Sequence, residues 1–265
     1  MRRLLVLVSL FLLACGYYWR VDGFFPFRIA VPLLASKDPI SSYDGKIPNV
    51  FHYLGKGHQV YAFESSGLVL KLFKKSHFNN FFNAFAKQER VRIYPESYPL
   101  ALKQLQEETG VLLVHLGHSD VSFPVVQVID RVGKSHPIDL NRVPFVLQKK
   151  GERPFFDLLQ NSPKEERALL IQAFCAFHQK RIDLCIADYD RDIEHNYCWN
   201  QSSLQYIDPA RMFYDPSLCD VQKREKEWWR ATHRLQKWLE QEHPEEVASH
   251  ECVLKIAQNP GDSTP

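Results

Sequence analysis

The chain has 265 residues, with hydrophobic residues at 45%, charged residues at 24% and a formal net charge of +2. This length suits one two-lobed domain or two small ones, and the composition is near the average for globular proteins rather than for disordered ones. The small net charge argues against nucleic acid as the main partner, because nucleic-acid-binding domains carry a concentrated basic face.

Residues 1–20 have the features of a signal peptide or membrane anchor. Arg2 and Arg3 precede an apolar run over residues 4–15, and aromatic residues follow at 17–19. The run is shorter than the roughly 20 residues that span a bilayer and fits a signal peptide. The aromatic residues would suit the interface of a short anchor, and residues 12–15 resemble a lipoprotein signal. A buried helix of the folded domain is the alternative, but we expect a membrane-associated or exported protein.

The next part of the chain changes from a linker to β-strands. Residues 21–49 mix aromatic residues and prolines without a sustained period, which is typical of a linker that packs on a domain. Short β-favouring runs at 50–54, 60–64 and 68–73 then predict a small antiparallel sheet. The run Ser65-Ser66-Gly67 supplies the turn between the last two runs.

The remaining chain is predicted to be mostly helical. We expect helices at 78–92 and 95–115, two strands at 123–130 and 144–148 joined through Gly133, and helices at 155–159, 165–181 and 223–241. Trp228, Leu235 and Trp238 share one side of the last helix, which favours packing against the rest of the domain. Residues 258–265 should be disordered.

This order of elements predicts an α+β protein with two lobes. The composition shifts near residues 148–152. We therefore expect a small, mostly β lobe over residues 50–148 and a larger helical lobe over residues 149–257.

A glycine-rich turn and a lysine form the first candidate binding feature. Gly55 and Gly57 lie between the first two predicted strands, where glycine lets the backbone bend closely over phosphates. An ordinary hairpin turn is the simpler interpretation, because two glycines are a weak signal. Lys71 stands inside the apolar run of the third strand, where a lysine needs a charged partner. The alternative places it in a solvated patch with Lys74 and Lys75.

Acidic residues flank an asparagine in the second half of the chain. Asp188 and Asp190 precede Asn196, and Asp208 follows a predicted hairpin with its turn near residues 200–203. Phosphoryl transfer requires a carboxylate that orients the accepting hydroxyl, and an asparagine and a second carboxylate that hold magnesium. A solvated acidic loop is the alternative.

These features resemble the protein-kinase-like superfamily over residues 50–214, and especially divergent kinase-like proteins of chlamydia-type bacteria. The run Glu107-Glu108-Thr109-Gly110 and the hinge-like residues 147–150 are similar to those proteins. The resemblance implies a protein-kinase-like two-lobed fold that binds ATP and Mg²⁺. A protein or a small molecule would accept the phosphate.

The same resemblance implies roles for individual residues. Gly55 and Gly57 would cover the phosphates, and Lys71 would contact them while Glu107 or Glu108, or alternatively Glu89, holds the lysine. The base would be Asp188 or Asp190, and the metal ligands would be Asn196 and Asp208.

The chain also departs from the kinase pattern. It has no His-Arg-Asp tripeptide, Asp208-Pro209-Ala210 replaces Asp-Phe-Gly, and no Ala-Pro-Glu follows. Three functions stay open: an atypical phosphotransferase, a pseudokinase that acts as a membrane-associated binding or scaffold protein, and a membrane-tethered structural or host-interaction protein.

The six cysteines form no Cys-x-x-Cys pair, which argues against a structural zinc site. Disulfides and buried thiols both remain compatible with their positions.

Overall fold

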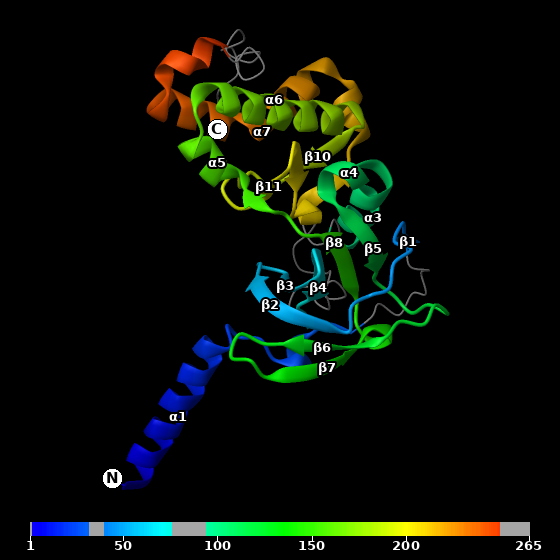
Figure 1. The fold of residues 1–265 in the computed structure, drawn as a ribbon, viewed down its shortest axis with the longest axis vertical. Helices are drawn as coiled ribbons and strands as arrows, with labels where there is room; N and C mark the ends of the chain where they lie inside the picture. Colours follow the sequence, from blue (N-terminus) through cyan, green and yellow to red (C-terminus); the bar gives the residue numbers. More distant parts are fainter. Residues whose placement is uncertain (1, 32–39, 76–93, 250–265) are drawn as a thin grey trace. The chain divides into compact units, whose positions relative to one another are not determined.

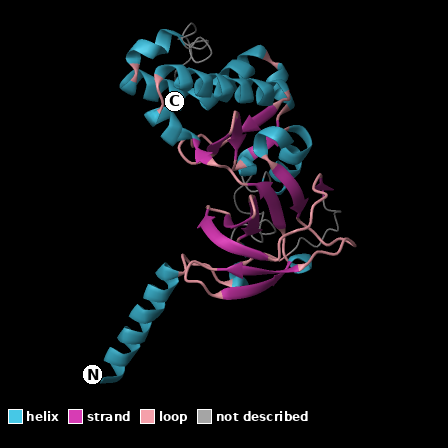
Figure 2. Ribbon diagram, viewed as in Figure 1, coloured by secondary structure: helices cyan, strands magenta, loops and turns pink. Residues whose placement is uncertain are grey.

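The computed structural model describes residues 2–31, 40–75 and 94–249 and divides into two compact units (Figure 1). Unit 1 comprises Met1–Val91 and Val111–Lys150, and unit 2 comprises Arg92–Gly110 and Gly151–Pro265. Both contain helices and strands, so the predicted α+β class is confirmed (Figure 2).

Unit 1 begins with helix α1, Arg2–Arg20, which covers the segment predicted as a signal peptide or anchor. The apolar side chains of residues 7–13 are exposed, for example Leu13 at 70%, and so is Trp19 at 77%. Among the helices that the structure describes, none combines the length and apolarity needed to cross a membrane.

The segment after α1 packs on unit 1. Phe24 is buried, and its ring meets those of Tyr61 and Phe63 edge-on at centroid distances of 5.1 Å. The short 3₁₀ helix η1, Pro26–Arg28, follows, and the backbone N–H of Ala30 donates to Phe73 O at 2.8 Å. Residues 21–31 therefore belong to the packed structure of this unit.

An eight-stranded sheet forms the body of unit 1, in the order β1-β5-β8-β4-β3-β2-β6-β7. Only the β2–β6 pair is parallel among its strands. The strands are β1, Ile40–Ser41; β2, Val50–Lys56; β3, Val60–Ser65; β4, Leu68–Phe73; β5, Val111–His115; β6, Val125–Ile129; β7, Ser135–Asp139; and β8, Phe145–Lys149.

The three predicted strands β2, β3 and β4 are confirmed. Ser66 and Gly67 form the two-residue connection between β3 and β4, and both have positive φ, at 49° and 77°. Two positive φ values are what a type I′ hairpin turn needs, and glycine adopts them without steric cost. This local chemistry fixes the register that places Lys71 opposite Ala62.

The predicted helix over residues 95–115 is wrong at its end. Helix α3, Tyr94–Gln104, and the short helix α4, Gln106–Thr109, stop at Gly110, whose φ of 64° caps α4. The apolar residues that follow form β5, because a continuous apolar run suits a buried strand as well as a helix. The predicted helix over residues 78–92 lies outside the described residues.

Strand β7 was not predicted, although the strands that precede and follow it in the sequence, β6 and β8, were. A turn held by Asp130, whose Oδ1 accepts from the N–H groups of Val132 and Lys134, joins it to β6. The predicted strands at 123–130 and 144–148 correspond to β6 and β8.

Unit 2 consists of helices with two small sheets, β10–β13 and β12-β11-β9. Besides α3 and α4 it contains β9, Arg153–Pro154; α5, Phe155–Asn161; α6, Lys164–Asp183; β10, Ile186–Asp188; β11, Tyr197–Asn200; β12, Ser203–Tyr206; β13, Met212–Tyr214; and α7, Val221–Glu242. Helices α6 and α7 lie side by side (Figure 1).

The core of unit 2 confirms the predicted apolar stripe on the last helix. Trp228 and Leu235 are buried, and Trp238 packs against Phe156 with ring centroids 5.7 Å apart. The predicted disordered tail, residues 258–265, lies outside the described part of the chain.

Candidate functional site

The predicted site residues are divided between the two units. Unit 1 carries Gly55, Gly57 and Lys71, whereas unit 2 carries both glutamates of α4 and the acidic set from Asp188 to Asp208. Local structure within each unit positions its own part of this set.

Gly55, predicted to lie between the strands, lies inside β2 opposite Ala62 of β3, and Gly57 lies in the turn that joins β2 to β3. The pairing of these strands shifts between Tyr53 and Gly55, and the N–H of Gly57 donates to Val60 O at 3.0 Å. A Cβ atom built at Gly55 meets no described atom within 4 Å, and one at Gly57 meets only Val60 Cγ2 at 3.8 Å. Packing therefore does not require glycine here, but glycine leaves the backbone of the turn uncovered.

Lys71 lies in the middle of β4, opposite Ala62 of β3 and Val146 of β8. Its side chain is 7% exposed, so the alternative that placed it in a solvated lysine patch is wrong for this residue. A buried ammonium is costly without a compensating negative or polar group. The position marks Lys71 as a functional or structural cation.

The two glutamates predicted as partners of Lys71 lie on α4 and differ in their surroundings. Glu107 is exposed, whereas Glu108 is half-buried and forms an ion pair through Oε1 with Lys180 of α6. The second oxygen of Glu108, Oε2, is buried and has no hydrogen-bond partner within the described residues. Glu89 lies outside those residues.

The hairpin of β11 and β12 brings the acidic set together. Tyr197 pairs with Tyr206, and just beyond this pair the N–H of Ile207 donates to Asn196 O at 2.8 Å. Asp208 follows Ile207 directly, and the hydroxyl of Tyr206 donates to Asp188 Oδ2 at 2.7 Å. Asn196 and Asp208 thus flank the open end of the hairpin, and Asp188 is hydrogen-bonded to the hairpin through Tyr206.

Asp188 is the buried member of this set, at 4% exposure. Its Oδ1 accepts from the N–H of Asp190 at 2.8 Å, and its own N–H donates to Glu227 Oε1 at 3.0 Å. Burial raises the pKa of Asp188 to about 7, against the opposing influence of Arg181 and the two hydrogen bonds it accepts.

Asp190 is only half-buried and can meet a substrate, unlike Asp188. Its Oδ1 accepts from the N–H of Asp192 at 3.0 Å, and its Oδ2 lies 3.7 Å from Nε of Arg211. Asp188 therefore holds the backbone of Asp190 in place. Asp188 is buried, whereas Asp190 is partly exposed to solvent.

Asn196 and Asp208 supply oxygen atoms of the type that Mg²⁺ prefers. Asn196 is 7% exposed, and its Nδ2 is buried without a hydrogen-bond partner in the described part of the chain. Such an atom marks a place where a ligand or a water molecule can complete the bonding, and the two ends of an amide are exchangeable by rotation. Asp208 is half-buried, with Oδ1 3.4 Å from the hydroxyl of Tyr98. An amide oxygen of Asn196 and a carboxylate oxygen of Asp208 are the atoms that would hold a magnesium ion here.

Comparison of the sequence with models of protein families gives no match, and comparison with curated proteins gives none either. Function must therefore be argued from the chemistry of the site.

The sequence prediction missed a buried network that supports the acidic set. Arg181 donates to Glu227 Oε1 at 2.7 Å and to Ile186 O at 2.6 Å, and both side chains are almost fully buried. The sequence contained a signal for the burial of Arg181, because this residue lies on the same face of the helix α6 as Phe174 and His178.

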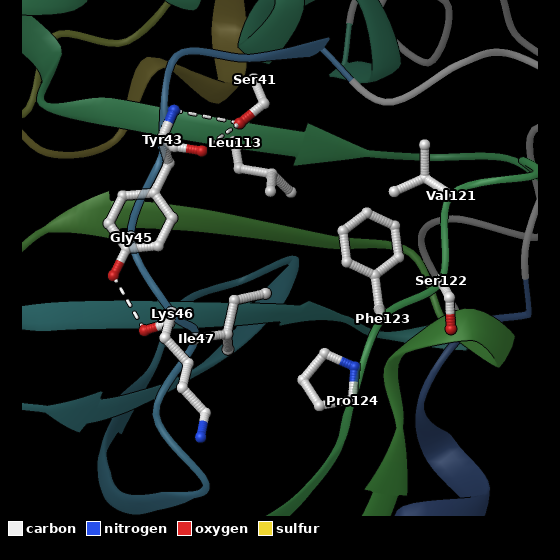
Figure 3. A pocket seen from close by; sticks show the side chains of 10 residues that line it. All are labelled: Ser41, Tyr43, Gly45, Lys46, Ile47, Leu113, Val121, Ser122, Phe123 and Pro124. Atoms are coloured by element: carbon white, nitrogen blue, oxygen red, sulfur yellow. Dashed lines mark hydrogen bonds between the residues drawn. The ribbon is translucent and has the colours of Figure 1, made fainter.

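A cavity of about 570 Å³ in unit 1 contains none of the predicted residues (Figure 3). Phe123, Ile47 and Leu113 give it apolar walls. Its polar groups bond to one another: Ser41 Oγ accepts from the N–H of Tyr43 at 3.0 Å, and the Tyr43 hydroxyl donates to Lys46 O at 3.0 Å. This cavity therefore lacks the converging polar groups of a catalytic site.

One group of metal-ligand side chains lies apart in sequence from the acidic set, at His243, Glu245 and Glu246. Both carboxylate oxygens of Glu246 accept from Arg167, at 3.0 Å and 3.1 Å. This ion pair gives Glu246 a structural role, so the group does not argue for a metal ion.

Proposed function

We propose that this chain is an atypical kinase-like phosphotransferase that uses ATP and Mg²⁺. Unit 1 would form most of a small lobe and unit 2 the large lobe of a protein-kinase-like fold. The observation that carries the proposal is the arrangement around the β11–β12 hairpin: Asn196 and Asp208 flank its open end, and Tyr206 of β12 bonds Asp188, which in turn holds Asp190.

The environments of the two aspartates support different roles. Asp190, which is partly exposed, would accept the proton of the attacking hydroxyl. Asp188, which is closed off from solvent, would position Asp190 through the bond from the Asp190 N–H to its Oδ1. Asp190 is thus the proposed catalytic base and Asp188 a positioning residue.

Asn196 and Asp208 are the proposed magnesium ligands. The link between Asn196 O and the N–H of Ile207 keeps them near each other on a rigid hairpin. When bound, Mg²⁺ would neutralise negative charge on the transferred phosphoryl group.

Unit 1 supports the proposal through the order of its elements. In protein kinases a glycine-rich turn covers the phosphates, and a lysine on the third strand contacts them. Here Gly55 lies near the end of β2, Gly57 lies in the turn to β3, and the next strand, β4, carries the buried Lys71. β4 is hydrogen-bonded on both sides, which fixes the lysine's backbone.

The test is binding and turnover of ATP by the full chain in a nonionic detergent, with and without Mg²⁺. Asp208→Ala and Lys71→Ala should weaken Mg²⁺-dependent ATP binding by about tenfold or more, because each removes a charged contact. Asp190→Asn should retain binding and lose turnover. Asp157→Asn is the matched control, because Asp157 is an exposed carboxylate on α5. A wild-type chain that binds no nucleotide would overturn the proposal.

A catalytically inactive pseudokinase that acts as a membrane-associated binding or scaffold protein is the second candidate. The segment after Asp208 favours it, because Pro209–Arg211 forms a 3₁₀ helix and the chain soon enters β13 and α7. The chain between Asp208 and α7 is therefore too short to contain the long peptide-binding segment of a protein kinase. This candidate predicts nucleotide binding without turnover. It also predicts unchanged cellular function when Asp188 and Asp190 are both replaced by Asn.

A further inference from the structure

A basic pocket of about 460 Å³ lies in unit 1 beside the C-terminal end of α1. Cationic side chains reach it from three separate segments: Arg28 from η1, Lys56 from the end of β2 and Lys74 from the residue after β4. Asp22 is the only carboxylate among its lining residues. The lining therefore carries an excess of positive charge.

The carboxylate of Asp22 already has partners within the protein. Its Oδ1 pairs with Lys56 Nζ at 2.5 Å, and its Oδ2 accepts from the hydroxyl of Tyr53 at 2.6 Å. Within the described residues, neither Arg28 nor Lys74 pairs with a carboxylate. Two cations in this pocket thus retain their capacity for an anion.

Arg28 and Lys74 are held in place by neutral groups. Arg28 Nη1 donates to the Tyr18 hydroxyl at 2.9 Å and to Gly23 O at 3.1 Å. Lys74 Nζ donates to Gly57 O at 2.5 Å and lies 4.8 Å from the centroid of the Tyr61 ring. Both side chains are half-buried, so their charges face the pocket in a restricted geometry.

The closeness of the three cations affects the pKa of Lys74. Burial, followed by repulsion from Lys56 and Arg28, lowers the pKa of Lys74 to about 8. An anion in the pocket would relieve that repulsion.

Gly23 shapes the wall of the pocket. Its φ is 69°, and a Cβ atom at this position would lie 2.9 Å from the Tyr18 hydroxyl oxygen and 3.3 Å from Arg28 Nη1. The glycine therefore lets Arg28 approach the backbone closely.

The pocket and Lys71 belong to opposite faces of the sheet. Tyr61, which lines the pocket, lies opposite Leu72, whereas Lys71 lies opposite Ala62. Because successive side chains of a strand alternate between faces, Tyr61 and Lys71 point in opposite directions. The pocket is thus separate from the proposed nucleotide-binding lysine.

We propose that this pocket binds a phosphate group, with Arg28 and Lys74 as its charged contacts. Guanidinium and ammonium groups bind phosphate oxygens through charge-assisted hydrogen bonds. Its place beside α1, whose apolar residues and Trp19 are exposed, suits the phosphate of an anionic lipid headgroup. A soluble phosphate has the same chemistry, and the experiment separates the two sources.

The experiment measures two affinities of the full chain at low ionic strength. One arm titrates inorganic phosphate into the chain in a nonionic detergent. The other compares vesicles of phosphatidylcholine alone with vesicles that also contain phosphatidic acid. The double variant Arg28→Gln/Lys74→Gln should bind phosphate, the phosphatidic acid vesicles, or both, about tenfold more weakly than wild type.

The matched control is Lys134→Gln/Arg142→Gln, which removes the same charge from exposed positions of unit 1 and should bind like wild type. If the double variant loses its thermal unfolding transition, Lys56→Gln replaces it. Lys56 is exposed, and its loss leaves Asp22 uncompensated, so binding should again weaken.

A loss confined to the vesicles assigns the pocket to a lipid headgroup, and a loss confined to inorganic phosphate assigns it to a soluble phosphate. Two results would overturn the proposal: wild type that binds neither probe, or a double variant that binds both as wild type does.

Discussion

The two units differ in where they place a cluster of charged side chains. Unit 1 builds its core from aromatic and aliphatic side chains of the sheet and gathers Arg28, Lys56 and Lys74 around an open pocket. Unit 2 instead places Arg181 and Glu227 inside its core, at 1% and 3% side-chain exposure. Arg28 and Lys74 of unit 1 are therefore available to ligands, whereas the buried Glu227 of unit 2 holds the backbone of Asp188.

This difference teaches where each kind of charge can act. A buried ion pair is a poor source of net stability, but breaking it leaves a charge without compensation. In unit 2 the pair fixes Asp188, because Glu227 Oε1 accepts both from Arg181 and from the N–H of Asp188. The buried pair therefore keeps the backbone of Asp188 in a defined position.

Removal of the buried cation should have the largest effect. We expect Arg181→Met to lower the free energy of unfolding by about 4 kcal/mol, because Glu227 stays buried without its partner. Urea denaturation measures the loss. The control is Arg224→Met, which breaks an exposed pair with Asp183 and should cost less than about 1 kcal/mol. Equal losses in both variants would contradict the contrast between buried and exposed charges.

The corresponding change in unit 1 concerns packing. Phe24→Ala should lower the free energy of unfolding by about 3 kcal/mol, because it leaves a cavity against Tyr61 and Phe63. Phe27→Ala is the control, because Phe27 is 75% exposed, and should have little effect. If Phe24→Ala is as stable as wild type, residues 21–31 contribute no core.

The pH dependence of stability should report Asp188. Its pKa rises from the ordinary value of 3.8 to about 7 on folding, so the folded chain binds the proton more tightly. This contribution to stability is present below about pH 4 and is lost as the pH rises through about 7, by on the order of 4 kcal/mol.

The variant Asp188→Asn should lack this loss, because its side chain does not ionise. The pKa of buried His178 is lowered by burial, which gives a slope of opposite sign, but that slope is common to both proteins. The difference between the two stability curves, measured by urea denaturation from pH 4 to pH 8, isolates Asp188. Parallel curves would refute the assignment.

The smallest stability effect is expected at Asn196. Because its buried Nδ2 has no partner among the described residues, Asn196→Leu should change the free energy of unfolding by less than about 1 kcal/mol. It should nevertheless abolish Mg²⁺-dependent ATP binding. Asn141→Leu in unit 1 is the contrast, because Asn141 bonds both the N–H and the carbonyl of Phe123 at 2.7 Å. That variant should lose about 1 to 2 kcal/mol and keep ATP binding.

Local sequence signals predicted those parts of the fold where turn chemistry and periodicity agree. The hairpin through Ser66 and Gly67 and the stripe on α7 are of this kind. β5 was misassigned because a continuous apolar run fits a helix and a buried strand equally. β7 was missed because it contains Pro137 and only one fully buried residue, Ile138.

For the candidate site, the sequence supplied the residue types but not their environments. It left Asp188 and Asp190 as equal candidates for the base. Their difference arises from burial beside Arg181 and Glu227, and Glu227 lies on a helix far along the chain. A contact at that sequence separation depends on tertiary packing, which local patterns do not report.

The two outer strands of the sheet in unit 1 have a consequence for the behaviour of the protein in solution. An unpaired outer strand can recruit a strand from another molecule and begin a β-sheet aggregate. β7 carries Pro137, which has no N–H to donate, and within the described part of the chain β1 comprises the two residues Ile40–Ser41. Both ends of the eight-stranded sheet are therefore poor templates for a strand from a second chain.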